Sequence, residues 1–224
     1  MAGEHIVRSF DEELKRLTST IGRMGGLAEA QIANAIQAVA RRDTELAASV
    51  VEADRRIDDL EREVDNQAVQ MLALRQPVAS DLRSIVGALR IASDVERIAD
   101  YAANVAKRAI ALSQMAPVRP AHAVPRMGRF VQEMIKDVLD AYANRDVDKA
   151  VAVWSRDEEL DEMYSSLFRE LLTYMMEDPR NITASTHLLF IAKNVERIGD
   201  HATNIAELVH YQITGRELED RPKL

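Results

Sequence analysis

The sequence predicts an all-α protein made of two tandem three-helix bundles, with spectrin-like, up-and-down helices. Three observations support this prediction. Apolar residues recur at three- and four-residue spacing through long segments, which is the period of an amphipathic helix. Six prolines divide the chain between these segments, and proline ends helices because it lacks an N–H donor and clashes with the preceding turn. The second half of the chain also repeats the first.

The first predicted bundle spans residues 1–114. Its helices are expected at about 5–40, 44–75 and 80–113. In the middle helix, Ile57, Val64 and Met71 share one face and provide its apolar stripe. Pro77 separates this helix from the next, and so short a connection favours antiparallel neighbours.

A proline-rich linker is predicted at 115–125, followed by the second bundle at 126–215 and a polar tail at 216–224. The helices of the second bundle are expected at about 123–144, 147–176 and 181–213. The tail has no apolar periodicity and ends the chain, so we expect it to fray.

The internal repeat is clearest in the third helix of each bundle. Residues 89–106 read LRIASDVERIADYAANVA and residues 189–206 read LFIAKNVERIGDHATNIA, with eleven of the eighteen aligned positions identical at a constant offset of one hundred. Unrelated amphipathic helices would match in apolar residues, but not in Glu, Arg, Asp and Asn. The match therefore indicates a duplicated unit.

The composition argues against several classes of protein. Lys and Arg number 29 against 37 Asp and Glu, a net charge of −8, whereas nucleic-acid binding needs a basic face. Without cysteine, disulfides, thiolate metal sites and cysteine nucleophiles are excluded. The first twenty residues carry acids where a signal peptide needs an apolar core, and no apolar run approaches the roughly 20 residues of a membrane helix. We expect a cytoplasmic protein without nucleic-acid binding or membrane insertion.

Carboxylates occupy apolar positions on the third helix of each bundle. In the first bundle the seam begins with Leu82, Val86 and Leu89 and continues along the same face to Glu96 and Asp100. The second bundle repeats the two acids as Glu196 and Asp200. A core-facing stripe is normally apolar, so the repeated acids indicate a specific role.

The second helix of each bundle supplies further carboxylates spaced by four residues: Asp54 and Asp58, and Asp157 and Asp161. Folding each hairpin about its turn places Asp100 beside Asp58, and Asp200 beside the second pair. The same register places Glu61 beside Glu96, but we assign Glu61 and its neighbours to a solvated face. The two acidic pairs of each bundle can therefore converge.

Converging carboxylates raise one another's pKa unless a positive charge is present. A divalent cation would supply that charge, and oxygen-only ligands favour hard cations such as Mg, Ca, Mn or iron. Asn104 and Asn204, one turn beyond the aspartates, are candidates for additional oxygen donors or for groups that orient the ligands. Arg97 and Arg197 are alternative counter-ions, although each lies 100° around the helix from its Glu.

Two other classes of function compete with a metal-organised helical bundle. A helical scaffold without metal would need no cation at the acids. A ferritin-like di-iron oxidase would need two E-x-x-H motifs, and this chain has one, at Glu207 and His210. His201 corresponds to Tyr101 in the repeat and is interpreted as structural. No Gly-rich phosphate loop or serine nucleophile motif occurs, so we predict no catalytic residues and no enzyme.

The paired signatures VERIADYAANVA (95–106) and VERIGDHATNIA (195–206), within a duplicated three-helix unit, resemble the PhoU family of the phosphate-specific transport system. The resemblance runs from Phe10 to about Gly215. It implies metal ions bound on a face of each bundle by E(D)xxxD motifs, at the positions Asp54/Asp58, Glu96/Asp100, Asp157/Asp161 and Glu196/Asp200. It also implies a negative regulator of the phosphate-starvation response that bridges the phosphate transporter's ATP-binding subunit and a membrane-bound sensor histidine kinase. Because symmetric dimers are common, we also expect a homodimer.

Overall fold

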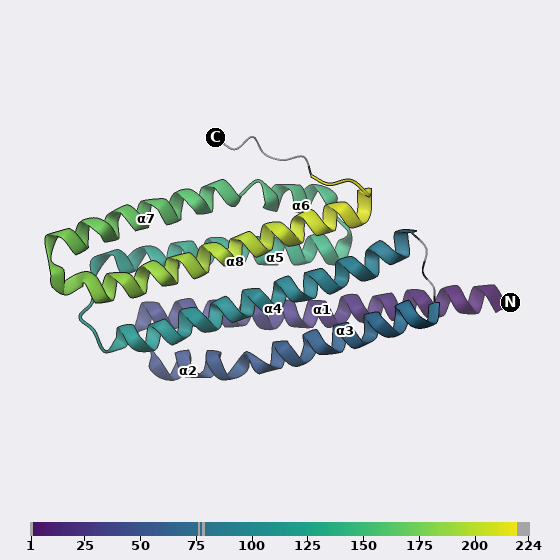
Figure 1. Cartoon of the computed structure of the whole chain (residues 1–224), viewed down its shortest axis with the longest axis horizontal. Coiled ribbons are helices and arrows are strands. Elements are labelled where there is room, and N and C mark those ends of the chain that lie inside the picture. Colours follow the sequence, from purple (N-terminus) through teal and green to yellow (C-terminus); the bar gives the residue numbers. More distant parts are fainter. Residues whose placement is uncertain (1, 76, 78, 219–224) are drawn as a thin grey trace.

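The computed structural model describes residues 2–75, 77 and 79–218, and every regular element in this part of the chain is helical. The helices pack side by side along the long dimension of the molecule (Figure 1). Their bounds are α1 Ala2–Arg41, α2 Thr44–Ala53, α3 Arg55–Arg75, α4 Ala79–Ser113, α5 Val124–Asn144, α6 Val147–Trp154, α7 Asp157–Glu177 and α8 Ile182–Thr214, with 3₁₀ helices η1 Arg119–Ala123 and η2 Pro179–Asn181. The prediction of an all-α fold is confirmed.

The two halves of the chain lie next to each other and share a broad contact. Helix α4 packs against α8, and α1 packs against α5, whereas α2–α3 and α6–α7 lie on the two outer flanks (Figure 1). The first and third helices of the two repeats therefore form the middle of the molecule. The second helix of each repeat, which carries part of the acidic motif, lies outside.

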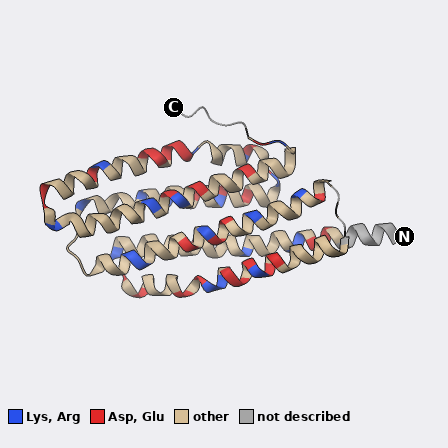
Figure 2. Ribbon diagram, viewed as in Figure 1, with Lys and Arg blue, Asp and Glu red and all other residues tan. Residues whose placement is uncertain are grey.

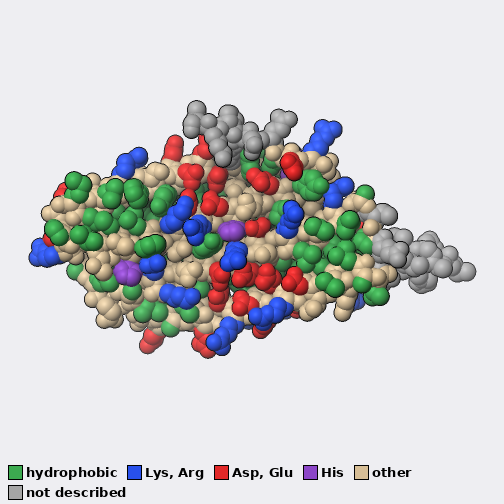
Figure 3. Space-filling view, viewed as in Figure 1, with side chains coloured by type: hydrophobic (Ala, Val, Ile, Leu, Met, Phe, Trp, Pro, Cys, Tyr) green, Lys and Arg blue, Asp and Glu red, His purple; other side chains and the backbone are tan. Residues whose placement is uncertain are grey.

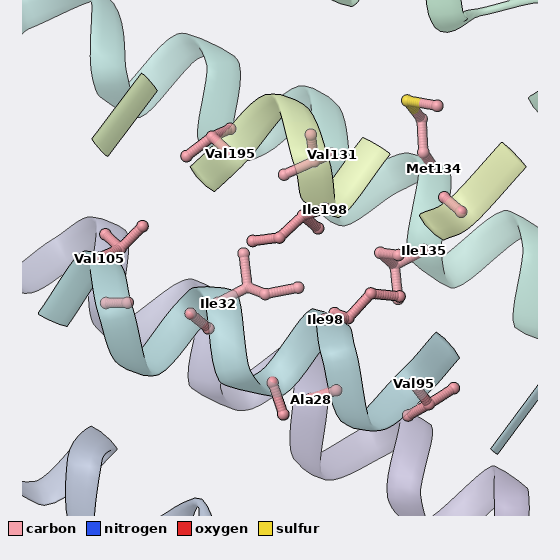
Figure 4. Close-up of a cluster of buried hydrophobic side chains, with 14 of the residues drawn as sticks. Ala28, Ile32, Val95, Ile98, Val105, Val131, Met134, Ile135, Val195 and Ile198 are labelled. Atoms are coloured by element: carbon pink, nitrogen blue, oxygen red, sulfur yellow. The ribbon is translucent and has the colours of Figure 1, made fainter. Parts of the chain in front are cut away.

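One hydrophobic core extends across both halves. Ile32 of α1, Ile98 of α4, Val131 and Ile135 of α5, and Ile198 of α8 are at most 1% exposed, and Figure 4 shows them facing one another between the four helices. Full burial of such a side chain contributes about 1.5–3 kcal/mol. The contact between the halves therefore stabilises both of them.

The second helix of each repeat is broken, which the sequence analysis did not predict. The segment expected as one helix at 44–75 is α2 and α3, separated at Asp54, and the segment expected at 147–176 is α6 and α7. Neither break contains Pro or Gly, so no local signal marks it. The first break is at Asp54, and the second immediately precedes Asp157, so each lies at the first aspartate of an acidic motif.

The first helix of each repeat ends in the same way. Arg42 and Arg145 adopt left-handed backbone conformations, with φ of 56° and 55°. The next residue, Asp43 or Asp146, is the N-cap of the following helix, where its carboxylate accepts the backbone N–H three residues on, at 2.9 and 3.0 Å. The matched Arg-Asp pairs therefore mark equivalent helix-to-helix turns.

The predicted linker at 115–125 packs against the protein. It contains η1, in which Pro120 is buried, and α5 already begins at Val124. The Arg42 guanidinium donates to the last carbonyls of α4 and its extension, those of Leu112 (2.6 Å), Ser113 (3.0 Å) and Met115. These bonds satisfy helix-end acceptors that have no partner within α4.

Candidate functional site

Helices α3 and α4, with the residue between α2 and α3, bring five carboxylates to one surface of the first half. We name these residues the first acidic cluster: Asp54, Asp58, Glu61, Glu96 and Asp100. Figure 2 shows the acidic residues along α3 and at the start of α7, and Figure 3 shows them gathered in two groups, one over α3 and α4 and one over α7 and α8. Basic side chains lie between the two groups.

The carboxylates of the first acidic cluster oppose one another's ionisation. Burial, together with the charges of Asp100 and Glu61, raises the pKa of Glu96 to about 7. Burial and the charges of Asp100 and Asp58 raise the pKa of Asp54 to about 6. Such shifts mean that the negative charge of the cluster is only partly compensated by the protein itself.

Glu61 belongs to this cluster, although we predicted a solvated position for it. Its side chain is half-buried, and burial with the neighbouring Asp65 charge raises its pKa, while the nearby Ser93 hydroxyl lowers it. The hairpin register already placed Glu61 level with Glu96. That signal was sufficient to find it.

The cations near the first acidic cluster are peripheral. Arg97 lies 3.7 Å from Glu96 (Nε to Oε2) and 3.6 Å from Asp100 (Nη1 to Oδ2), and 58% of its side chain is exposed. Ion pairs at such separations and exposure contribute little. Asn104, predicted to assist the acids, instead accepts from Lys107 Nζ at 3.4 Å.

The second acidic cluster consists of Asp157, Asp161, Glu196 and Asp200, from α7 and α8. Burial and the charges of Glu196 and Asp157 raise the pKa of Asp200 to about 6, while Lys193 lowers it. Glu196 is only 8% exposed, and Lys193 Nζ lies 2.5 Å from both of its carboxylate oxygens. This half therefore contains its own counter-ion.

Two of the residues predicted to assist the second cluster lie elsewhere. The Arg197 guanidinium lies over the ring of Tyr101, 5.6 Å from its centroid. Asn204 is exposed and lines a groove of about 920 Å³ between α4 and α8.

The histidines near the acidic motifs have structural partners. His201 Nδ1 lies 2.7 Å from Asp94 Oδ1 and joins α8 to α4. The E-x-x-H pair is engaged by other groups, since Glu207 accepts from Trp154 Nε1 at 2.9 Å and His210 Nδ1 lies 2.9 Å from the carbonyl oxygen of Arg216. The second motif that a ferritin-like di-iron site requires does not occur in the sequence.

The donor chemistry of the first acidic cluster fits a hard cation. Its ligands would be carboxylate oxygens only, they are partly buried, and they repel one another. Within residues 2–75, 77 and 79–218, no group of three or more His, Asp or Glu side chains is disposed to hold a metal ion as the side chains lie. The carboxylates are gathered on one surface without forming a closed ligand set.

Fold and site together define a class of protein: a duplicated all-α bundle with an acidic motif repeated in each half. The PhoU domain matches this chain twice, over residues 21–109 and 124–209. The chain belongs to the PhoU family.

Relatives match this chain along its whole length. A phosphate-specific transport system accessory protein PhoU homolog of Caulobacter vibrioides is 55% identical over 223 residues, which is 99% of this chain and 97% of the relative. The protein of the same name from Rhizobium meliloti is 51% identical, over 100% of this chain and 95% of the relative.

Solved structures agree with the fold. The crystal structure of PhoU from Pseudomonas aeruginosa matches with a TM-score of 0.89 and 44% identity, covering 92% of this chain and all of the other. The phosphate transport system regulatory protein PhoU from Streptococcus pneumoniae gives a TM-score of 0.86 at 29% identity, covering 94% of this chain and 99% of the other. The family resemblance drawn from the two signatures is therefore confirmed.

Proposed function

We propose that this protein is a non-enzymatic regulator of phosphate uptake that restrains the phosphate-starvation response when phosphate is plentiful. The observation that carries the proposal is similarity over 99% of the chain to a protein named as an accessory of the phosphate-specific transport system. The S. pneumoniae structure bears the name of a regulatory protein of phosphate transport. Regulation would proceed by contact with the transporter's ATP-binding subunit and with a sensor histidine kinase.

The described helices favour a docking role over membrane insertion. In the residues that the structure covers, no helix is long and apolar enough to cross a membrane. Contact with a membrane transporter would therefore use the protein surface formed by these helices. A packed helical bundle offers rigid helix faces and grooves for such contacts.

A deletion strain tests this regulatory role. A phosphate-starvation reporter in phosphate-rich medium should be repressed in the parent strain, active after deletion of the gene, and repressed again when the wild-type gene is restored. Unchanged reporter output after deletion would overturn the proposed function. Co-purification of the tagged protein with the ATP-binding subunit, and separately with the kinase, tests the two proposed contacts.

A hard divalent cation is proposed as the counter-charge for the acidic motifs. Its ligands in the first half would come from Glu96 and Asp100 of α4, Asp58 of α3, and Asp54 between α2 and α3. In the second half they would be Asp157, Asp161, Glu196 and Asp200. When bound, such an ion would neutralise the carboxylates and fix the second helix of a repeat against the third. The high pKa of Glu96 supports the need for this charge.

Elemental analysis tests the metal proposal. Purified wild-type protein is compared with the variant Glu96→Ala, Asp100→Ala, Glu196→Ala, Asp200→Ala after equilibration with Mn, Mg, Ca or iron and removal of free ion. Lower metal content in the variant supports the assignment, and equal content in the two proteins overturns it. A metal-free scaffold, the second candidate, would keep its thermal stability when a chelator is added, whereas a metal-bound protein would lose part of it.

A further inference from the structure

The two acidic clusters differ at two matched positions. On the third helix, Ser93 of the first half corresponds to Lys193 of the second. On the second helix, the offset that relates Asp54 to Asp157 also relates Glu61 to Tyr164. The duplicated motif therefore has a hydroxyl and an acid in one half, and an ammonium and an aromatic ring in the other.

The two exchanged positions interact with each other in both halves. In the first half, the Ser93 hydroxyl lies near enough to Glu61 to lower the pKa of that carboxyl. In the second half, Lys193 Nζ lies 5.3 Å from the centroid of the Tyr164 ring, a distance at which a cation is attracted to the ring face. The exchange is therefore coordinated: where the lysine is present, the additional acid is absent.

Lys193 lies against the buried acid of its cluster. Its Nζ is 2.5 Å from both oxygens of the buried Glu196. The ammonium therefore lies where it compensates the Glu196 carboxylate directly.

Among the described residues, no lysine forms an ion pair with Glu96 as Lys193 does with Glu196, although the charge of Lys107 lowers the pKa of Asp54. Arg97 contacts it at 3.6–3.7 Å with most of its side chain in solvent. Ser93 brings no charge, and Glu61 adds a fifth carboxylate. The two halves therefore differ in charge at the position where the acids meet.

We infer that Lys193 takes, in the second half, the place that a divalent cation takes in the first, so that metal binds at the first acidic cluster and not at the second. The inference rests on the metal binding proposed above. An ammonium in contact with both oxygens of Glu196 would compete with a metal ion for the same ligand atoms. A metal ion bound to Glu196 would also lie close to the ammonium of Lys193. The repulsion between these two positive charges is strong in a partly buried site.

Reciprocal exchange of the matched residues tests the inference. Mn²⁺ is titrated into chelator-stripped, purified wild-type protein and into two double variants, Ser93→Lys/Glu61→Tyr and Lys193→Ser/Tyr164→Glu. We expect one class of site in the wild type, at least tenfold weaker binding in the first variant, and a second site in the other. Lys149→Ser is the matched control, because it removes a lysine paired with Asp137 and Asp140 away from the clusters and should leave Mn²⁺ binding unchanged.

Single substitutions locate the wild-type site. Glu96→Gln should weaken Mn²⁺ binding at least tenfold, whereas Glu196→Gln should leave it unchanged. If both substitutions weaken binding equally, the two halves are equivalent and the inference is wrong, while the proposed metal binding stands. If the wild type binds no Mn²⁺, Mg²⁺, Ca²⁺ or iron, the metal proposal fails and takes the inference with it, whereas the regulatory role remains open to the reporter test.

Thermal melting in chelator gives a readout that does not depend on bound metal. Lys193→Ser should lower the Tm by several degrees, because Glu196 is left buried without its cation, and Ser93→Lys should raise it. Added Mn²⁺ should restore the Tm of Lys193→Ser. Far-UV circular dichroism verifies that each variant is helical. Equal melting of Lys193→Ser and wild type in chelator would overturn the role given to the lysine.

Discussion

At the scale of single residues, the acidic clusters show how burial and neighbouring acids raise the pKa of a carboxyl group. Glu96 and Asp54 are held beside other acids with few cations near them, and their pKa values are raised to about 7 and about 6. An acid whose pKa is raised by folding binds its proton more tightly in the folded protein than in the unfolded chain. Metal-free stability therefore falls as these groups ionise.

Substitution of Glu96 makes this dependence measurable. Its ordinary pKa of 4.5 rises to about 7 in the folded protein, so the loss of stability from its ionisation occurs between these two pH values. In chelator, Glu96→Gln should melt close to wild type at pH 4.5 and several degrees higher at pH 7.5, because glutamine cannot ionise. Melting curves over this range provide the check, and a Tm difference independent of pH would contradict the assigned cause.

The sequence was sufficient to find some members of the clusters and not others. Glu96 and Asp100 were visible because acids on an apolar seam break a periodic pattern. Lys193 was overlooked, although its spacing of three residues from Glu196 is one at which helix side chains meet. The direction of Arg197 could not be predicted, because its ring partner Tyr101 belongs to the other half of the chain and depends on how the halves pack.

At the scale of helices, segments punctuated by proline or by Arg-Asp turns were predicted close to their observed ends. The breaks at Asp54 and before Asp157 were not, because neither contains Pro or Gly. Such a break is set by tertiary packing, which overrides the weak local propensity. Helix ends could therefore be predicted where proline or an Arg-Asp turn marks them in the sequence. They could not be predicted where tertiary packing alone sets them.

The two left-handed arginines permit a matched test of these turns. Arg145→Gly should raise the free energy of unfolding by up to about 1 kcal/mol, because glycine adopts positive φ without steric cost. Arg42→Gly gains the same relief but loses three hydrogen bonds to carbonyls at the end of α4, so it should be destabilised by about 1–3 kcal/mol. Urea denaturation measures both, and equal effects of the two substitutions would contradict a special role for Arg42.

At the scale of the whole molecule, the two repeats are not structurally independent units. The halves share a core along α1, α4, α5 and α8, and surface contacts join them at the same interface. His201 bonds to Asp94 across it, and the guanidinium of Arg108 lies 4.0 Å from the centroid of the Phe190 ring. A change in one half should therefore be transmitted to the other, in keeping with the proposed contacts to two partners.

This coupling predicts a single unfolding transition, and the one tryptophan of the chain reports on it. Trp154 lies on α6 in the second half, whereas Ile57, fully buried, lies on the outer flank of the first. Ile57→Ala should cost about 2–5 kcal/mol and lower the midpoint seen by Trp154 fluorescence as much as that seen by circular dichroism. Leu160→Ala, at the matched position of the second half, is the control and should lower both midpoints. A tryptophan transition that responds to Leu160→Ala alone would mean that the halves unfold separately, and the shared core would then not couple them.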